Sequence, residues 1–116
     1  LEDDEMVRDA VAMMLRSDDH EVVTARNAAE ALGFLERGSY DVIVSDLRIP
    51  NMDGPTFYRE LKQRWPAALP RLIFMTGHAD DPAYARFLRE TGAPVLAKPF
   101  TPESLRQAVQ QAFVAP

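Results

Sequence analysis

The chain has 116 residues, a formal net charge of −5 and no cysteine, and 47% of its residues are apolar. This length favours one domain, residues 1–116, with a single core, and the lack of cysteine excludes disulfides, thiolate metal sites and cysteine nucleophiles. No basic run indicates nucleic-acid binding, no apolar run approaches the roughly 18 residues of a membrane span, and no signal peptide is visible. We therefore expect a soluble cytoplasmic protein without direct contacts to nucleic acid or membrane.

Helical and extended patterns alternate along the whole sequence. Apolar residues recur at helical spacing in five segments, separated by short apolar or β-branched runs. Asn27 with Glu30 predicts a capping box at one helix start, and Thr101 with Pro102 predicts the start of the last helix. The predicted elements are, in order, helix 5–17, strand 21–25, a helix between Asn27 and Gly38, strand 42–44, a helix opening at 54–55, strand 71–75, helix 82–92, strand 94–97 and a helix capped by Thr101.

The first residues, Leu1 to Glu5, read as the end of a strand whose apolar body is absent. Counting this partial strand, five strands alternate with five helices. Such an order predicts an α/β fold with a doubly wound, five-stranded parallel sheet, covered on both faces by right-handed crossovers. We expect native residues to precede Leu1, and we expect the 116-residue piece alone to fold poorly, because a central strand would be incomplete.

Polar side chains follow four of the predicted strands. The acidic residues 2–4 follow the first strand, Asp46 the third, Thr76 the fourth and Lys98 the fifth. The carboxyl ends of parallel strands share one edge of a sheet, where ligands collect. Clustered carboxylates favour a hard divalent cation such as Mg²⁺, and a hydroxyl and an ammonium facing it would suit a phosphoryl group held between them. Asp46 is the best-placed carboxylate to act as the nucleophile and form an aspartyl phosphate.

Taken together, these motifs resemble the receiver domains of two-component response regulators. Each motif alone is weak, but their order and spacing are specific and cover the chain except for the missing start of the first strand. The resemblance implies the flavodoxin-like receiver fold and Mg²⁺-dependent transfer of a phosphoryl group from a phosphohistidine, or a small phosphodonor, to Asp46. The matching segments are 2–5 with Arg8, 46–54, 75–78 and 97–100.

The resemblance also implies a set of metal ligands. Counted back from Arg8, the acidic pair of the family falls on Glu2 and Asp3. Asp3 would then bind Mg²⁺ directly, together with the Asp46 carboxylate, and Glu2 would act mostly through water. The backbone carbonyl of Arg48, two residues after the phosphoacceptor, would complete the protein ligands.

Two further residues take roles from the same resemblance. Thr76 would bond one phosphoryl oxygen, Lys98 would neutralise another, and Lys98–Pro99 would be a cis peptide bond. One position departs from the better-known receivers: Val95 stands where they carry a switch aromatic that rotates inward on phosphorylation, which puts the usual threonine–aromatic output route in question. The segment 94–100 is more similar to receivers fused to hybrid sensor kinases, which favours a hybrid histidine kinase as the parent chain.

The partners implied are a histidine kinase or phosphotransfer domain and an effector or output domain or protein. Phosphorylation would switch the surface formed by the helix from Pro82, the strand 94–97 and the last helix, and the same surface offers a face for a homodimer. Such a domain is not a metabolic enzyme by itself, since its chemistry is limited to its own phosphorylation and dephosphorylation.

Two other functions stay open. A pseudo-receiver would keep the fold as a protein-interaction module without being phosphorylated, but the loss of the acceptor, lysine or acidic pair that would mark it is not seen. A phosphohydrolase of the haloacid-dehalogenase type would use an aspartyl phosphate. Those enzymes carry a second aspartate two residues after the nucleophile, where this chain has Arg48.

Overall fold

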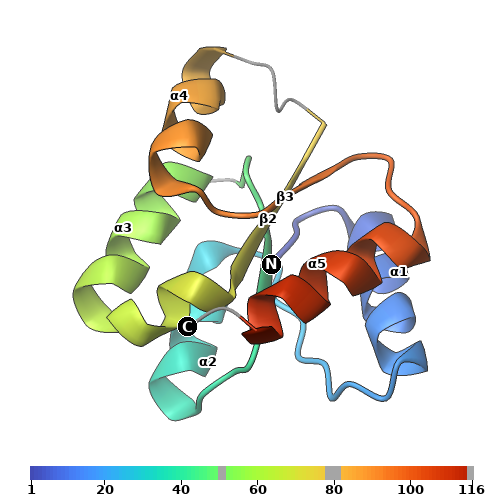
Figure 1. The fold of residues 1–116 in the computed structure, drawn as a ribbon. Helices are drawn as coiled ribbons and strands as arrows, with labels where there is room; N and C mark the ends of the chain where they lie inside the picture. The colour runs from blue at the N-terminus through green and yellow to red at the C-terminus, as the bar shows by residue number, and fades with distance from the viewer. Residues whose placement is uncertain (50–51, 78–81, 115–116) are drawn as a thin grey trace.

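The structure, a computed structural model, describes residues 1–49, 52–77 and 82–114; Pro50, Asn51 and His78 of the predicted motifs lie outside them. This part of the chain forms five α-helices, one 3₁₀-helix and three strands (Figure 1). The elements are α1 (Glu5–Ser17), α2 (Ala28–Arg37), β1 (Ile43–Asp46), α3 (Gly54–Arg64), η1 (Pro66–Arg71), β2 (Leu72–Thr76), α4 (Pro82–Thr91), β3 (Val95–Ala97) and α5 (Pro102–Val114).

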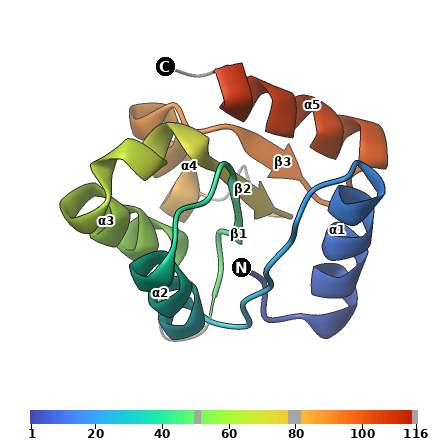
Figure 2. The same ribbon diagram turned by 90° about the horizontal axis from the view of Figure 1, so that it is seen from below.

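The strands form a parallel sheet in the order β1-β2-β3, with helices on both of its faces. Figure 2 shows α2 and α3 on one side of the sheet and α1 and α5 on the other. Side chains of β2 alternate between the two faces, as the strand geometry requires: Leu72 and Phe74 enter the core under α2 and α3, and Ile73 and Met75 enter the core under α1 and α5. The predicted α/β class with a doubly wound parallel sheet is confirmed.

The first two residues occupy the position of the predicted first strand. The α-amino group of Leu1 donates to the carbonyl of Val44 at 2.7 Å, and the amide of Asp46 donates to the carbonyl of Leu1 at 2.8 Å. On the other side, the amide of Glu2 donates to the carbonyl of Ala25 at 3.0 Å. The two residues therefore bridge β1 and the segment that ends at Ala25.

The sheet of the described residues has three strands, where the sequence predicts five. Residues 21–25, predicted as a strand, form none, because a strand needs a hydrogen-bonding neighbour along its length and only Leu1 and Glu2 lie between this segment and β1. A cavity of about 550 Å³ lies beside β1 at this place, lined mainly by α1, α2, β1 and residues 20–25.

The predicted helix caps are present, with one change. The side chain of Asn27 accepts a hydrogen bond from the amide of Glu30 at 2.9 Å, as expected. The Glu30 carboxylate, however, accepts hydrogen bonds from the amide and the guanidinium of Arg26, at 2.9 and 2.8 Å. At α5, Thr101 accepts from the amide of Ser104 at 3.1 Å. None of the helices in the described ranges is both long and apolar enough to cross a membrane.

Candidate functional site

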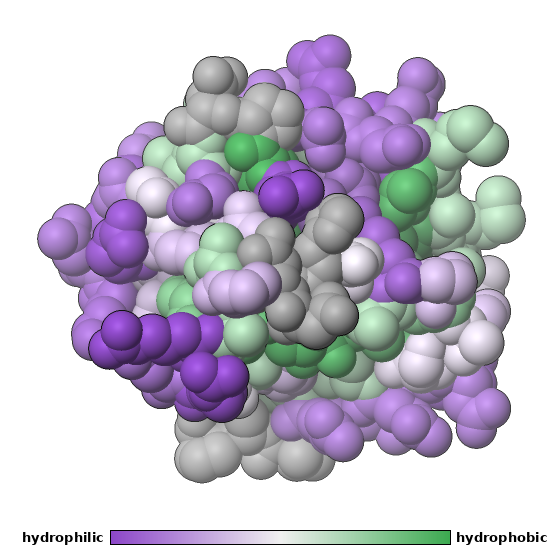
Figure 3. Space-filling model, turned by 90° about the horizontal axis from the view of Figure 1, so that it is seen from above, coloured by the Kyte–Doolittle hydropathy of each residue, from purple (hydrophilic) through white to green (hydrophobic). Residues whose placement is uncertain are grey.

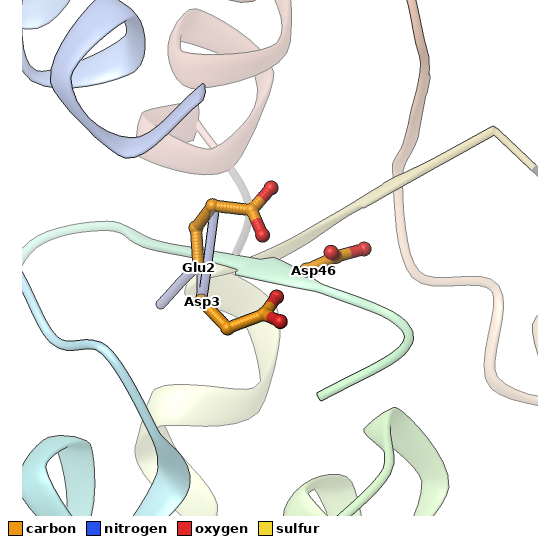
Figure 4. Close-up of side chains that lie close together, drawn as sticks. All are labelled: Glu2, Asp3 and Asp46. Atoms are coloured by element: carbon orange, nitrogen blue, oxygen red, sulfur yellow. The ribbon is translucent and has the colours of Figure 1, made fainter. Parts of the chain in front are cut away.

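Three carboxylates meet at the carboxyl edge of the sheet. Glu2 and Asp3 come from the start of the chain and Asp46 from the end of β1, and one oxygen of each lies within 4.8 Å of the others. Figure 4 shows the three carboxyl groups around one space. Glu2 and Asp46 are 2% and 8% exposed, whereas Asp3 is exposed to solvent. The structure thus brings together the three acidic residues that the sequence assigns to a metal.

Lys98, directly after β3, donates hydrogen bonds to two of these carboxylates. Its Nζ lies 2.7 Å from Oε1 of Glu2 and 3.2 Å from Oδ2 of Asp46. Burial alone would lower the pKa of Lys98, but the hydrogen bond to Glu2 and the charges of Asp46 and Glu2 outweigh burial and raise that pKa above its ordinary value. Lys98 is therefore charged. A cluster of carboxylate oxygens of this kind suits a hard divalent cation.

The other acidic residue of the first segment has a structural role. Asp4 caps α1 and accepts hydrogen bonds from the amides of Met6 and Val7 at 2.9 and 3.2 Å. Arg8, one turn into the helix, donates to the backbone carbonyl of Glu2 at 3.2 Å. These contacts orient the start of the chain so that Glu2, and not Asp4, faces the sheet edge.

Thr76 lies at the same edge, at the end of the central strand. It is 2% exposed, and its carbonyl accepts a hydrogen bond from the amide of Lys98 at 2.8 Å. In the sheet register, Asp46 pairs with Met75, the residue before Thr76. Thr76, the residue predicted to bind a phosphoryl oxygen, therefore lies between the strand ends that carry Asp46 and Lys98.

Hydrogen bonds from backbone amides lie at both ends of the segment between β1 and α3. The amide of Arg48 donates to Oδ1 of Asp46 at 3.4 Å, and the amide of Gly54 donates to the carbonyl of Leu47 at 2.8 Å. A Cβ at Gly54 would lie 2.5 Å from Cδ1 and 3.0 Å from the carbonyl oxygen of Leu47, so any larger residue would require a shift there. Asp53 caps α3 by accepting from the amide of Thr56 at 3.0 Å.

The surface around the sheet edge is mostly polar. Seen from above in Figure 3, hydrophilic side chains cover most of this face outside the grey residues, with small apolar patches between them. The peptide bond between Lys98 and Pro99 is cis, as predicted. A polar, partly open edge with a cluster of carboxylates and one ammonium is suited to a charged ligand and a cation.

Comparison with known proteins gives a consistent result. The family model of the response regulator receiver domain matches residues 1–110. The chain is 37% identical over 114 residues to the sensor kinase CckA of Brucella abortus, covering 96% of this chain and 12% of that protein. It is 31% identical over 113 residues to the transcriptional regulatory protein GlrR of Escherichia coli, covering 97% and 25%. The chain thus spans a quarter or less of the length of these relatives.

Solved structures resemble the whole fold. The Vibrio cholerae chemotaxis protein CheY4 superposes with a TM-score of 0.84 at 28% identity, covering 96% of this chain and 92% of that one. The receiver domain of the sensor histidine kinase PA1611 from Pseudomonas aeruginosa, described with a magnesium ion coordinated in its active-site cleft, gives 0.85 at 27% identity, covering 97% and 93%. The predicted receiver fold is confirmed.

Proposed function

The chain belongs to the response regulator receiver domain family of two-component signalling, and we propose that Asp46 accepts a phosphoryl group from a phosphohistidine. The observation that carries this proposal is the position of the Asp46 carboxylate, which lies at the end of β1 beside two further carboxylates and 3.2 Å from the ammonium of Lys98. A carboxylate so placed can act as a nucleophile toward phosphorus while neighbouring charges hold the transferred group. Residues 1–116 would act as one receiver unit.

The residues present fit Mg²⁺. Its preferred ligands are oxygens, and the cluster offers three carboxylates whose oxygens lie within 4.8 Å of one another. Asp3 and Asp46 would bind the cation directly, with the carbonyl of Arg48. Glu2 is buried and bonded to Lys98 at 2.7 Å, which supports a role through water rather than as a direct ligand. When bound, the cation would neutralise charge between the carboxylate and the incoming phosphoryl group.

The transfer would proceed by in-line displacement. An oxygen of Asp46 attacks the phosphorus, so that an O–P bond forms while the P–N bond of the phosphohistidine breaks and the imidazole nitrogen keeps the electron pair. Lys98 then pairs with one phosphoryl oxygen, and Thr76 donates its hydroxyl to another. In the reset, water attacks the phosphorus, the O–P bond to Asp46 breaks, and inorganic phosphate leaves.

A histidine kinase or phosphotransfer domain would be the donor, and an effector or output domain would receive the signal. The similarity to a sensor kinase at 37% identity favours a hybrid histidine kinase as the parent chain. Phosphorylation would switch the surface made by α4, β3 and α5, which could also serve as a homodimer face. Val95 of β3, 38% exposed, lies in this surface.

The direct test is the intact mass after incubation with phosphoramidate, with and without Mg²⁺. We expect a gain of about 80 Da, one phosphoryl group, that requires Mg²⁺ and is absent from Asp46→Asn. Folded wild-type protein that binds Mg²⁺ but gains no mass would instead support a pseudo-receiver. A gain that persists in Asp46→Asn would place the acceptor elsewhere.

A further inference from the structure

Arg48 connects the loop after the proposed phosphoacceptor with α4. Its amide donates to the Asp46 carboxylate at 3.4 Å, and its guanidinium carbon lies 5.8 Å from the centre of the Tyr84 ring. A guanidinium at this distance from an aromatic face is attracted to it. One residue thus contacts Asp46 through its backbone and the first turns of α4 through its side chain.

Helix α4 packs against the core only through partly buried side chains, those of Tyr84, Phe87 and Leu88. None of its residues, all of which lie in the described ranges, is buried. Its ring contacts centre on Phe87, which packs edge-on against Phe74 of β2 and Tyr58 of α3 at 5.6 and 5.4 Å. Phe87 lies near the middle of the helix and Tyr84 nearer its start. A helix with few buried contacts opens easily, and its first turns respond most to the loss of a contact there.

The threonine–aromatic route between Asp46 and α4 lacks its aromatic residue in this chain. The position on β3 that would carry the aromatic is Val95, which has neither a ring nor a hydrogen-bonding group. The Arg48 guanidinium can bind a phosphoryl group through two parallel hydrogen bonds. A charge-assisted bond of this kind is stronger than a cation–π contact made by an exposed guanidinium, and Arg48 is exposed.

We propose that Arg48 relays the phosphorylation state of Asp46 to α4 by exchanging the Tyr84 ring for the phosphoryl group. Without phosphorylation, Arg48 holds the first turns of α4 through Tyr84. When Asp46 carries the dianionic group, the guanidinium moves toward it and α4 loses that contact. This inference rests on the proposed function, since it requires the phosphoryl group on Asp46. The Arg48 guanidinium is here a positioning group, distinct from the backbone carbonyl of Arg48 that is proposed as a Mg²⁺ ligand.

The test measures amide hydrogen exchange of residues 82–91, with and without phosphoramidate and Mg²⁺, while intact mass records phosphorylation in the same samples. The variants are Arg48→Met, which keeps the length but removes the guanidinium, and Tyr84→Leu, which removes the ring. Arg89→Met, an exposed arginine on α4, is the control. Without phosphorylation, we expect about two- to fivefold faster exchange at the start of α4 in Arg48→Met and Tyr84→Leu, as the strength of an exposed cation–π contact implies.

Phosphorylation should produce a similar acceleration in wild type and in Arg89→Met, and little further change in the two test variants. When Arg48→Met and Tyr84→Leu are combined, their effects on the exchange rate of α4 should not add, because both substitutions remove the contact between Arg48 and Tyr84. If both test variants gain the phosphoryl group and α4 still responds as in wild type, the relay is wrong. If the wild type gains no phosphoryl group, the proposed function fails and the relay fails with it, although faster exchange in the unphosphorylated variants would still show the contact.

Discussion

Lys98 donates a 2.7 Å hydrogen bond to Glu2, although the two residues lie 96 positions apart. The bond joins the residue after β3 to the start of the chain, and the same ammonium reaches Asp46 at 3.2 Å. Because Glu2 is 2% exposed, its carboxylate depends on this partner for compensation. Lys98 therefore serves the fold in the absence of any phosphoryl group, as well as the proposed chemistry.

Lys98→Met should destabilise the protein. The buried Glu2 carboxylate would lose its hydrogen-bonded cation, and we expect the free energy of unfolding to fall by about 1–3 kcal/mol. Lys98→Arg should lose less, since it keeps a charged donor, and Lys62→Met, at an exposed position on α3, should have little effect. Urea unfolding at pH 7 without Mg²⁺ measures the three variants. Equal stability of Lys98→Met and wild type would contradict the role assigned to this contact.

Gly54→Ala should also destabilise the fold, by steric conflict. Its Cβ would lie 2.5 Å from the side chain and 3.0 Å from the carbonyl oxygen of Leu47, so the loop after Asp46 would have to shift. Overpacking of this kind costs about 1–3 kcal/mol. Gly38→Ala is the matched control, because its backbone is extended and a Cβ there meets no atom within 4 Å among the described residues. A similar small loss of unfolding free energy in both variants would contradict the prediction.

Much of the fold follows from local pattern. Leu72 and Phe74 face one core and Ile73 and Met75 the other, as the buried run of β2 predicts, and the helix caps follow from side chains a few residues apart. The strand predicted at 21–25 did not form, because β-propensity describes a side chain and not the neighbour that the backbone needs.

The site was predicted less completely than the fold. Motif order placed Glu2, Asp46 and Lys98 at one sheet edge, but the bond from Lys98 to Glu2 depends on side-chain conformations that sequence spacing does not describe. The contact between Arg48 and Tyr84 was missed for the same reason. The one available signal was Val95, which put the threonine–aromatic output route in question.

The ion pair between Asp18 and Arg106 predicts a pH dependence. A hydrogen bond from Arg106, 3.0 Å from Oδ2, lowers the pKa of Asp18 below its ordinary value. A carboxyl with a lowered folded-state pKa stabilises the fold above its unfolded-state value of about 3.9, and this stabilisation is lost as the pH falls through the folded-state pKa. Asp18→Asn should therefore lower the urea midpoint at pH 7 and have less effect in strong acid.

The control for this measurement is the next residue. Asp19 has a left-handed backbone with φ of 65°, which asparagine also adopts readily, so Asp19→Asn leaves the turn intact. Its effect on the urea midpoint should be similar at both pH values. If the effect of Asp18→Asn were equally independent of pH, the pair with Arg106 would not contribute to stability in solution.

Mg²⁺ affinity should separate two adjacent aspartates. Asp3 belongs to the carboxylate cluster, whereas Asp4 caps α1. Asp3→Asn removes one charge from the proposed metal site, and we expect the Mg²⁺ dissociation constant to rise by about tenfold or more, since even indirect ligand partners are worth that much. Asp4→Asn should change it by no more than about twofold, because asparagine caps a helix as well as aspartate does.

Isothermal titration with MgCl₂ measures both constants, and urea unfolding checks that each variant remains folded. Because the two substitutions change the net charge equally and lie one residue apart, a general electrostatic effect would weaken binding in both to a similar extent. Equal weakening would therefore contradict direct coordination by Asp3 and indicate that the cation responds to the charge of the whole acidic segment. Selective weakening in Asp3→Asn would support the ligand set proposed for this edge of the sheet.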